Sequence, residues 1–367
     1  MNTKKMRYVW FLVILCIFCL TLFLARTRSK VEMRNRIYHQ WNEHFVVSKG
    51  KESYVRTTND SNQTVVLSEA QSYGMLITVA AAEKGQAQQA DFDRLYQYYL
   101  NHRLEGTQLM SWKQTIANGE ASVEGHNATD GDLYIAYALL KAAQQWPKQA
   151  KDYQAQAKAI LEDILAHNYN EETGVLTVGN WANQDSEFYH LMRTSDTLPA
   201  QFQIFYEVTK DSKWLAIKEK MLQQLQTISS QTKTGLLPDF IWVDEQGTRV
   251  ADPKTIESKY DGAYSYNACR LPYNLIQSKD ADSQKLVKKI LNFFKSQRNL
   301  YAGYDLKGKA LNNHQAASFL APIVYASEQE KGYLKLVQQN KYIFTQDLPL
   351  NNYYDATMTT MIALELF

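Results

Sequence analysis

The chain has 367 residues, of which 45% are hydrophobic and 21% charged, a composition that supports a sizeable folded core and excludes a disordered chain. Its formal net charge of +2 is unevenly distributed: residues 1–36 hold eight basic residues and one acid, a net of +7, which leaves −5 for residues 37–367. A mildly acidic main part argues against nucleic acid as a partner.

The N-terminal segment has the pattern of a membrane anchor. Lys4, Lys5 and Arg7 precede an apolar run over residues 9–25, and further basic residues follow it. Seventeen residues are at the lower limit for crossing a bilayer, and no clean small-x-small cleavage site follows. We predict a cytoplasmic tail and uncleaved signal anchor in residues 1–30. Residues 31–367 then form one domain outside the cell membrane. A cleaved signal peptide is the alternative and leads to the same compartment.

Cysteine usage fits an extracellular domain that does not depend on disulfides. Cys16 and Cys19 lie in the apolar run, so only Cys269 remains in the main part of the chain. We expect no intrachain disulfide there, which a domain with its own large core tolerates.

Apolar residues at helical spacing recur along most of the chain. The polar links between these stretches contain Gly, Asn, Asp or Pro, convincing period-two strands are scarce, and no repeat is strong enough for a solenoid. The pattern favours one large all-α domain, but periodicity does not separate an α/α barrel from another helical bundle. The predicted helices are Ser72–Glu83, Phe92–Leu104, Leu133–Gln145, Tyr153–His167, Pro199–Val208, Trp214–Ile228, Gln284–Gln297, Ala317–Tyr325, Lys331–Gln339 and Tyr354–Leu366.

Two acidic motifs stand where predicted helices begin. Ser68 is placed to cap a helix that runs to Glu83, which puts Glu69 in its first turn. Glu69 is then either a glutamate that complements the helix dipole or a functional acid at the domain's rim. Asp130 and Asp132 flank a glycine before an apolar helix, so they are either a turn residue and an N-cap or carboxylates at the mouth of a cleft.

A third acidic stretch, residues 255–273, is rich in tyrosines and leads to Asn267 and Arg270. An arginine beside carboxylates positions one of them or tunes its charge, and a solvated loop with a structural salt bridge is the alternative. Other chemistries find little support, because the sequence has no H-E-x-x-H spacing, no G-x-S-x-G elbow and no phosphate-binding glycine loop. The Asp-Gly-Asp motif lacks the remaining ligands of an EF-hand.

Together these motifs resemble family 8 of the glycoside hydrolases from about residue 40 onward. The matching stretches include residues 68–75, 128–133, 236–240, 266–272 and 352–355, in family order. The resemblance implies an (α/α)6 barrel and an inverting, endo-acting hydrolase of β-1,4-linked polysaccharides such as chitosan, mixed-linkage β-glucan or cellulose-like glucan. It requires no metal or organic cofactor.

The resemblance also assigns roles to particular residues. Glu69 matches the general acid, and Asp130 matches the carboxylate that holds the distorted sugar beside the cleaved bond. The substrate-binding set that the matching motifs suggest is Tyr73, Trp112, Asp196, Tyr266, Asn267, Arg270 and Tyr354.

The sequence departs from many family members at Asn267, where they carry an aspartate as general base. An amide does not take a proton from water near neutral pH. A branch similar to chitosanases and lichenases also has asparagine there, with its base elsewhere, and Thr194-Ser195-Asp196 resembles that branch. Glu257 is then our candidate base and Asp261 the second. The alternative is a catalytically impaired polysaccharide-binding or scaffold protein of an exopolysaccharide export system.

We expect a polysaccharide as the main partner, the membrane as a second partner through the N-terminal helix, and a monomeric catalytic domain. An anchored hydrolase of this kind is suited to trimming an exopolysaccharide as the cell exports it.

Overall fold

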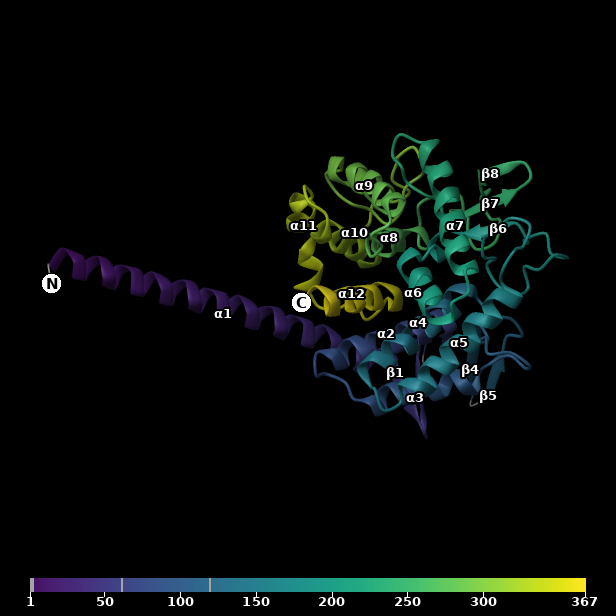
Figure 1. Cartoon of the computed structure of the whole chain (residues 1–367), viewed down its shortest axis with the longest axis horizontal. Coiled ribbons are helices and arrows are strands. Elements are labelled where there is room, and N and C mark those ends of the chain that lie inside the picture. Colours follow the sequence, from purple (N-terminus) through teal and green to yellow (C-terminus); the bar gives the residue numbers. More distant parts are fainter. Residues whose placement is uncertain (1–2, 61, 119) are drawn as a thin grey trace.

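The computed structural model describes residues 3–60, 62–118 and 120–367 and contains twelve α-helices in these ranges. Most of them are paired as an inner and an outer helix of an (α/α)6 barrel, the fold expected from the resemblance (Figure 1). The inner helices are α2 (Ser68–Glu83), α4 (Thr129–Gln145), α6 (Pro199–Thr209), α8 (Leu271–Ile276), α10 (Ala317–Gln329) and α12 (Tyr353–Leu366). The outer helices are α3 (Gln89–Asn101), α5 (Ala150–His167), α7 (Lys213–Ser230), α9 (Ala281–Ser296) and α11 (Leu334–Asn340), completed by part of α1 (Thr3–Phe45).

Each outer helix contacts the inner helix before it in the chain, and α1 contacts α12. The inner helices are apolar on most sides; Leu133, Ile135 and Leu139 of α4, for example, are fully buried. A helix that is apolar nearly all round is stable only when neighbours cover every side. The core therefore lies in the ring of inner helices.

The ten helices predicted from periodicity are all present, with ends that differ by a few residues. α8 was not predicted, since a helix of six residues is too short to show a 3.6-residue period. The basic stretch after the apolar run was not predicted as a helix either. It continues α1 without a break to Phe45.

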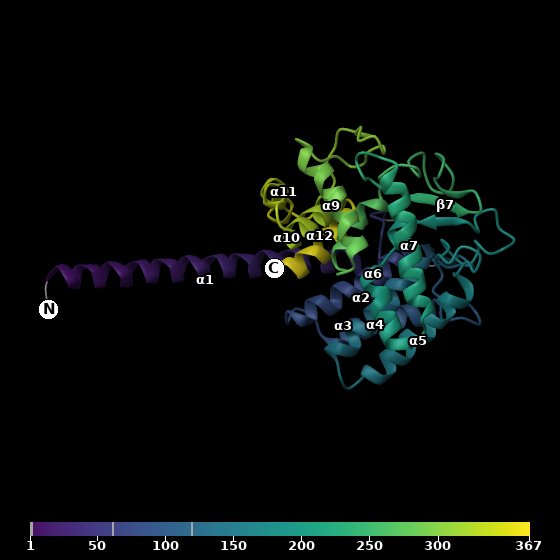
Figure 2. The ribbon, with the colours of Figure 1, turned by 45° about the horizontal axis from the view of Figure 1, so that its top comes forward.

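α1 has two parts in different surroundings. Its apolar part is exposed, and α1 is the single helix among the described residues that is long and apolar enough to cross a membrane, as an anchor or a signal sequence would be. The second part lies on the barrel, where Ile37, Tyr38, Trp41 and Phe45 are buried. Trp41 Nε1 also donates a hydrogen bond of 2.9 Å to Thr357 Oγ1 of α12. One helix therefore supplies both the exposed apolar segment and an outer helix of the barrel (Figure 2).

In the described part of the chain, eight short antiparallel strands form three small sheets, which the sequence analysis did not predict. Two strands lead directly to acidic or basic residues at one end of the barrel: β3 runs into α2, and β6 ends at Arg193. The strands are β1 (Val46–Lys49), β2 (Glu52–Val55), β3 (Gln63–Leu67), β4 (Lys113–Ala117), β5 (Glu120–Val123), β6 (Leu191–Arg193), β7 (Phe240–Asp244) and β8 (Gly247–Val250). Three short 3-10 helices are η1 (Thr194–Asp196), η2 (Ala268–Arg270) and η3 (Lys341–Phe344).

Candidate active site

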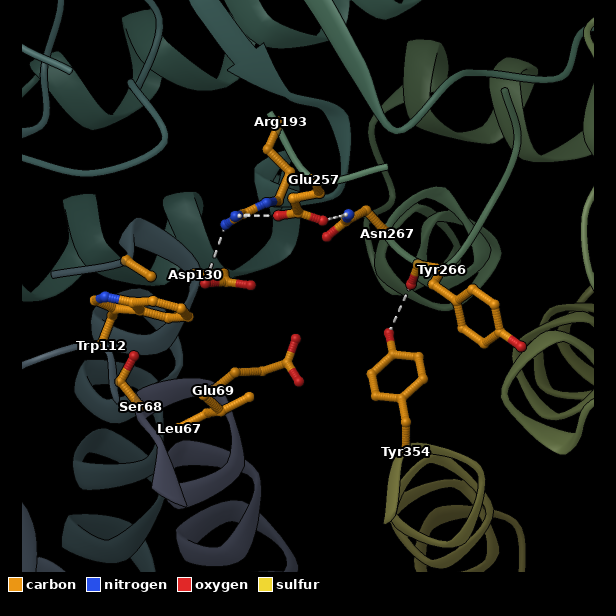
Figure 3. A pocket seen from close by; sticks show the side chains of 11 residues that line it. Leu67, Ser68, Glu69, Trp112, Asp130, Arg193, Glu257, Tyr266, Asn267 and Tyr354 are labelled. Carbon is orange, nitrogen blue, oxygen red and sulfur yellow. Dashed lines mark hydrogen bonds and ion pairs between the residues drawn. The ribbon is translucent and has the colours of Figure 1, made fainter. Parts of the chain in front are cut away.

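A pocket opens at the end of the barrel where α2, α4 and α12 begin (Figure 3). It combines carboxylates, one arginine and several aromatic rings, which is the type of lining that polar ligands with apolar faces require. The residues that line it are Leu67, Ser68, Glu69, Trp112, Ala128, Asp130, Arg193, Glu257, Tyr266, Asn267 and Tyr354.

Close packing of two helix ends places Glu69 and Asp130 side by side in the first turns of α2 and α4. A Cβ on Gly131 would lie 2.2 Å from Ser68 Oγ, so the glycine of the Asp-Gly-Asp motif allows this approach. Ser68 is the first residue of α2 and makes no capping hydrogen bond, in contrast to the cap predicted from the sequence. Asp132 is not an N-cap either, since α4 begins at Thr129 and the Asp132 carboxylate accepts from Met110 N and Asn127 Nδ2.

Arg270 connects these two carboxylates from behind the pocket wall. Its Nη1 lies 2.7 Å from Glu69 Oε2 and 3.2 Å from Asp130 Oδ2. The guanidinium also donates to Tyr73 Oη at 2.9 Å and to Ser195 Oγ at 2.8 Å. Because the Arg270 side chain is 1% exposed, it fixes the acids rather than presenting itself to the pocket.

Arg193 connects Asp130 to the opposite side of the pocket. Its Nη1 lies 3.2 Å from Asp130 Oδ1 and its Nη2 lies 3.1 Å from Glu257 Oε1. The sequence analysis missed this residue. The signal available was its position directly before the Thr194-Ser195-Asp196 motif, which alone does not show where the side chain points.

Asn267 closes a ring of contacts around the pocket. Its Nδ2 donates to Glu257 Oε2 at 2.8 Å, and its Oδ1 accepts from Arg270 Nη2 at 3.1 Å. The closed ring of contacts consists of Arg270, Asn267, Glu257, Arg193 and Asp130. Glu69 is attached to this ring through Arg270. Glu69 and Glu257 extend into the pocket from opposite sides of this ring (Figure 3).

The charges in this cluster are not balanced when every acid is ionised, because four carboxylates, including Asp196, face two arginines. Burial raises the pKa of Glu69 to about 7, against the opposing effect of Arg270 and with a further increase from Asp130. Burial likewise raises the pKa of Asp196 to about 7, opposed by Arg193. Burial also acts to raise the pKa of Asp130, but Arg193 and Arg270 outweigh it and lower that pKa. Two carboxyls with pKa values raised to about 7, Glu69 and Asp196, thus lie close to Asp130, whose pKa is lowered.

Two buried aspartates shape the loop half of the pocket. Asp261 accepts the backbone N–H groups of Ile256, Glu257 and Ser258 at 2.7–3.1 Å. Asp239 accepts those of Ser265, Asn267 and Ala268 at 2.7–3.1 Å. Asp261, the second candidate base from the sequence, does not line the pocket, because its carboxylate is 1% exposed and its acceptor positions face backbone amides.

The predicted substrate-binding residues divide into two groups. Trp112, Tyr266, Asn267 and Tyr354 line the pocket. Tyr73, Asp196 and Arg270 do not, because their side chains are buried behind its wall, in contact with the arginines and acids described above.

The described residues contain no group of three or more His, Cys, Asp or Glu side chains arranged to hold a metal ion. The carboxyl groups of the pocket differ in pKa and lie next to aromatic surfaces, an arrangement suited to proton transfer.

Comparison with known proteins identifies a family. The model for glycosyl hydrolases family 8 matches residues 13–365. A beta-glucanase of Niallia circulans is 30% identical over 299 residues, which cover 78% of this chain and 72% of the relative. Endoglucanase A of Acetivibrio thermocellus is 28% identical over 315 residues, which cover 83% of this chain and 62% of the relative.

Solved structures agree with the barrel described above. The apo structure of a beta-1,3-1,4-glucanase from Paenibacillus sp. X4 superposes with a TM-score of 0.82 at 25% identity, covering 93% of this chain and 92% of that one. Rex8A from Paenibacillus barcinonensis, complexed with xylose, superposes with a TM-score of 0.72 at 22% identity over 91% of this chain and 93% of that one, a likeness of fold.

Proposed function

This chain belongs to the glycosyl hydrolases of family 8, and we propose that it is an inverting endo-hydrolase of mixed-linkage or other β-1,4-linked glucans, with Glu69 as general acid and Glu257 as general base. The observation that carries the proposal is the closed ring of contacts that holds these two carboxyl groups on opposite sides of one pocket. Its relatives include a beta-glucanase and a structure of a beta-1,3-1,4-glucanase.

The proposed reaction needs two groups of opposite protonation state. Glu69, with its pKa raised to about 7 by burial, donates a proton to the glycosidic oxygen as the bond to the anomeric carbon breaks. Glu257 removes a proton from the water that attacks the opposite face of the sugar. Inverting hydrolases place these groups roughly 6.5–9.5 Å apart to leave room for that water. The product then has the inverted anomeric configuration.

Asn267 and Arg193 act in this proposal as positioning residues for Glu257. Each contacts a different oxygen of its carboxylate, and each is itself tied to the acid side of the pocket through Arg270 or Asp130. The asparagine thus orients the base instead of serving as one. Asp130 carries negative charge beside Glu69, where it both favours the protonated acid and stabilises positive charge on the distorted sugar.

The charge of the pocket favours a neutral glucan over chitosan. With Glu69 and Asp196 protonated, two ionised carboxylates face two arginines, so a cationic polymer meets no excess negative charge. Trp112, Tyr266 and Tyr354 supply flat apolar surface for pyranose rings.

The purified full chain in detergent tests the proposal with mixed-linkage β-glucan, carboxymethylcellulose, chitosan and xylan in parallel. We expect fastest release of reducing ends from mixed-linkage glucan, with the α-anomer formed first by NMR. A β-anomer as first product would contradict inversion. Binding of glucan without release of reducing ends from any polymer would favour the scaffold function instead.

The role of Glu257 has its own test. We expect Glu257→Ala to be inactive on polysaccharide and sodium azide to restore turnover, giving a glycosyl azide of inverted configuration. Glu245→Ala, an exposed glutamate away from the pocket, is the matched control and should keep wild-type activity. Full activity of Glu257→Ala without azide would place the base elsewhere.

We further propose that residues 1–30 are an uncleaved anchor that holds this hydrolase on the outer face of the cell membrane, where it meets exported polysaccharide. The support is the continuity of α1, whose apolar part leads without a break into a barrel helix. Deletion of residues 1–30 should give a soluble, active domain. Deletion of residues 1–45 should abolish folding, because it also removes the buried side chains of Trp41 and Phe45.

A further inference from the structure

The apolar part of α1 leaves the barrel at the end opposite the pocket. Phe45, the last residue of α1, contacts the ring of Tyr353 at a centroid distance of 5.8 Å, next to Tyr354 in the pocket wall. Towards the other end, Arg34 Nη1 donates to the carbonyl of Phe367 at 2.9 Å, and Lys30 Nζ lies 5.4 Å from the centre of the Phe367 ring. α1 is therefore antiparallel to α12 and points its apolar part away from the pocket.

Because α1 is an unbroken helix, its rise per residue gives the distances from the apolar run to the barrel and to the pocket. At about 1.5 Å of rise per residue, Lys30 lies about 8 Å beyond Ala25, the last residue of the apolar run, and Phe45 lies about 30 Å beyond it. A membrane crossed by residues 9–25 is thus next to the end of the barrel that holds Phe367. The pocket, next to Phe45, is held roughly 30 Å from the end of the apolar run.

The segment around α11 lies at this end of the barrel, on the side from which α1 leaves (Figures 1 and 2). Arg36 of α1 donates to the carbonyls of Phe344 and Gln346 at 3.2 and 3.0 Å, which ties the residues after α11 to α1. The surface that we call the α11 patch consists of Lys331, Leu334, Lys335 and Lys341, all exposed.

The α11 patch has the character of a membrane-contacting surface. Residues 331–346 contain three lysines and no acid. Of the flanking acids, Glu330 pairs with Lys288 at 3.3 Å and Asp347 with Arg36 at 3.4 Å, although the Asp347 side chain is 94% exposed, and Glu328 is exposed. Leu334 is 65% exposed between two lysines. Exposed leucine flanked by basic residues is suited to the boundary between lipid headgroups and acyl chains.

We propose that the α11 patch binds the anionic lipid headgroups of the membrane that α1 crosses, with Leu334 entering the interface. The proposal rests on the membrane anchor proposed above. Basic residues are attracted to an anionic bilayer within about a Debye length, roughly 8 Å at physiological salt. Arg36, which contacts the residues after α11, lies about 16 Å beyond Ala25; the headgroup layer covers roughly 5–7 Å of that distance, and extended lysine side chains cover a further part. Because the unbroken helix α1 joins the anchor to the barrel that carries the patch, binding of the patch needs no further search for the membrane.

This second contact fixes the orientation of the barrel relative to the membrane. With α1 alone, the barrel would be free to tilt with its helix; with α1 and the α11 patch it is held at two places. The pocket then faces away from the lipid, towards polymer outside the cell.

The test measures the reactivity of lysines in the full chain reconstituted into nanodiscs. Acetylation by an amine-reactive reagent, followed by mass spectrometry, is compared between discs with anionic phosphatidylglycerol and zwitterionic discs. We expect Lys331, Lys335 and Lys341 to react at least several-fold more slowly in anionic discs and to recover in high salt. Lys254, an exposed lysine in the loop that precedes Glu257, is the control and should react equally in both.

A variant sharpens the test. The double substitution Lys331→Glu and Lys335→Glu should remove the difference in Lys341 reactivity between the two kinds of disc, whereas Lys254→Glu should preserve it. Equal reactivity of the three patch lysines in both discs for the wild type would overturn the proposal. Protection by a dissolved polyphosphate but not by anionic discs would overturn it in favour of a soluble polyanion.

The two proposals fail in different ways. Protein that does not co-elute with the discs would overturn the anchor and with it the α11 patch contact. Protein that co-elutes, hydrolyses glucan and shows no protection would overturn the patch contact alone.

Discussion

The two sides of the pocket are built differently. Glu69 and Asp130 stand in the first turns of two long helices, α2 and α4, and their backbone is fixed by the helices themselves. Glu257 and Asn267 stand in loops, where no helix or sheet accepts their backbone N–H groups. Asp261 and Asp239 supply those acceptors, three hydrogen bonds each.

This difference in construction predicts which substitutions each side of the pocket tolerates least. On the helix side, many backbone hydrogen bonds and the close contact of Gly131 with Ser68 share the task of placing the acids. On the loop side, a single carboxylate holds a whole turn, and its loss leaves three amides without acceptors. A fully buried amide without an acceptor costs about 1–3 kcal/mol; two of the Asp239 amides are buried, and those that Asp261 accepts are partly buried and cost less. We therefore expect the helix side to be sensitive mainly in its reacting groups and the loop side also in its supports.

The largest effect is expected on the helix side itself. Glu69→Gln removes the proposed proton donor with little change of volume, and should lower kcat by about 10²–10⁴-fold while glucan binding persists. The measurement is kcat and KM on mixed-linkage β-glucan. Glu83→Gln, at the other end of α2, is the control and should match wild type. Near wild-type kcat for Glu69→Gln would remove Glu69 from the proposed role.

On the loop side, a support should matter nearly as much as a reacting group. Asp261→Asn replaces one of the two acceptor oxygens with an NH2 group that only donates. At least one backbone N–H of residues 256–258 then loses its acceptor, and the turn that carries Glu257 shifts. Small misplacements of a reacting group cost about 10²-fold in rate, and we expect a kcat loss approaching that size with an unchanged far-UV spectrum. Asp244→Asn, another aspartate that accepts a backbone amide but in an exposed turn, should be silent. An Asp261→Asn enzyme with full kcat would show that the loop needs no such support.

This contrast also explains how much of the site was predictable. Glu69 and Asp130 lie in motifs that precede or begin periodic helices, so sequence reveals both their type and their place. For Asp261 the sequence shows a carboxylate near Glu257 but not its direction, and the structure turns it towards backbone amides. Arg193 was missed because its partners Asp130 and Glu257 are 63 and 64 residues away in sequence.

The fold shows the same limit. Helices long enough for several periods were predicted, whereas strands of three to five residues show too few alternations to be recognised. The barrel part of α1 did carry a signal: Ile37, Trp41 and Phe45 recur every four residues and are all buried. Its basic residues, next to an apolar run, directed the interpretation towards a membrane flank instead.

The dependence of kcat on pH should follow the protonation of Glu69, on the helix side of the pocket. The general acid works when protonated, so kcat should fall as pH rises through about 7, the raised pKa of Glu69, by up to tenfold per pH unit above it. Asp130 contributes to that raised pKa, so Asp130→Asn should move this decline to lower pH, whatever it does to the maximal rate. A decline that stays in place in Asp130→Asn would mean that another group controls it.

The smallest effect is expected where the two sides touch. Tyr354, in the first turn of α12, donates its hydroxyl to the carbonyl of Tyr266 at 3.0 Å and so ties the loop side to a helix. Tyr354→Phe keeps the ring in the pocket wall and removes this bond, whose net worth is about 0.5–1.5 kcal/mol, together with a long contact of 3.9 Å to Cys269 Sγ. Because 1.4 kcal/mol corresponds to about tenfold, kcat/KM should fall by about two- to tenfold. Tyr264→Phe is the matched control, since that buried hydroxyl has no hydrogen-bond partner among the described residues. If Tyr354→Phe instead equals the control, the loop side is held by Asp239, Asp261 and Arg193 alone. If it costs as much as Asp261→Asn, then a single hydroxyl supports the loop as strongly as a buried carboxylate, and the two sides of the pocket differ less than their architecture indicates.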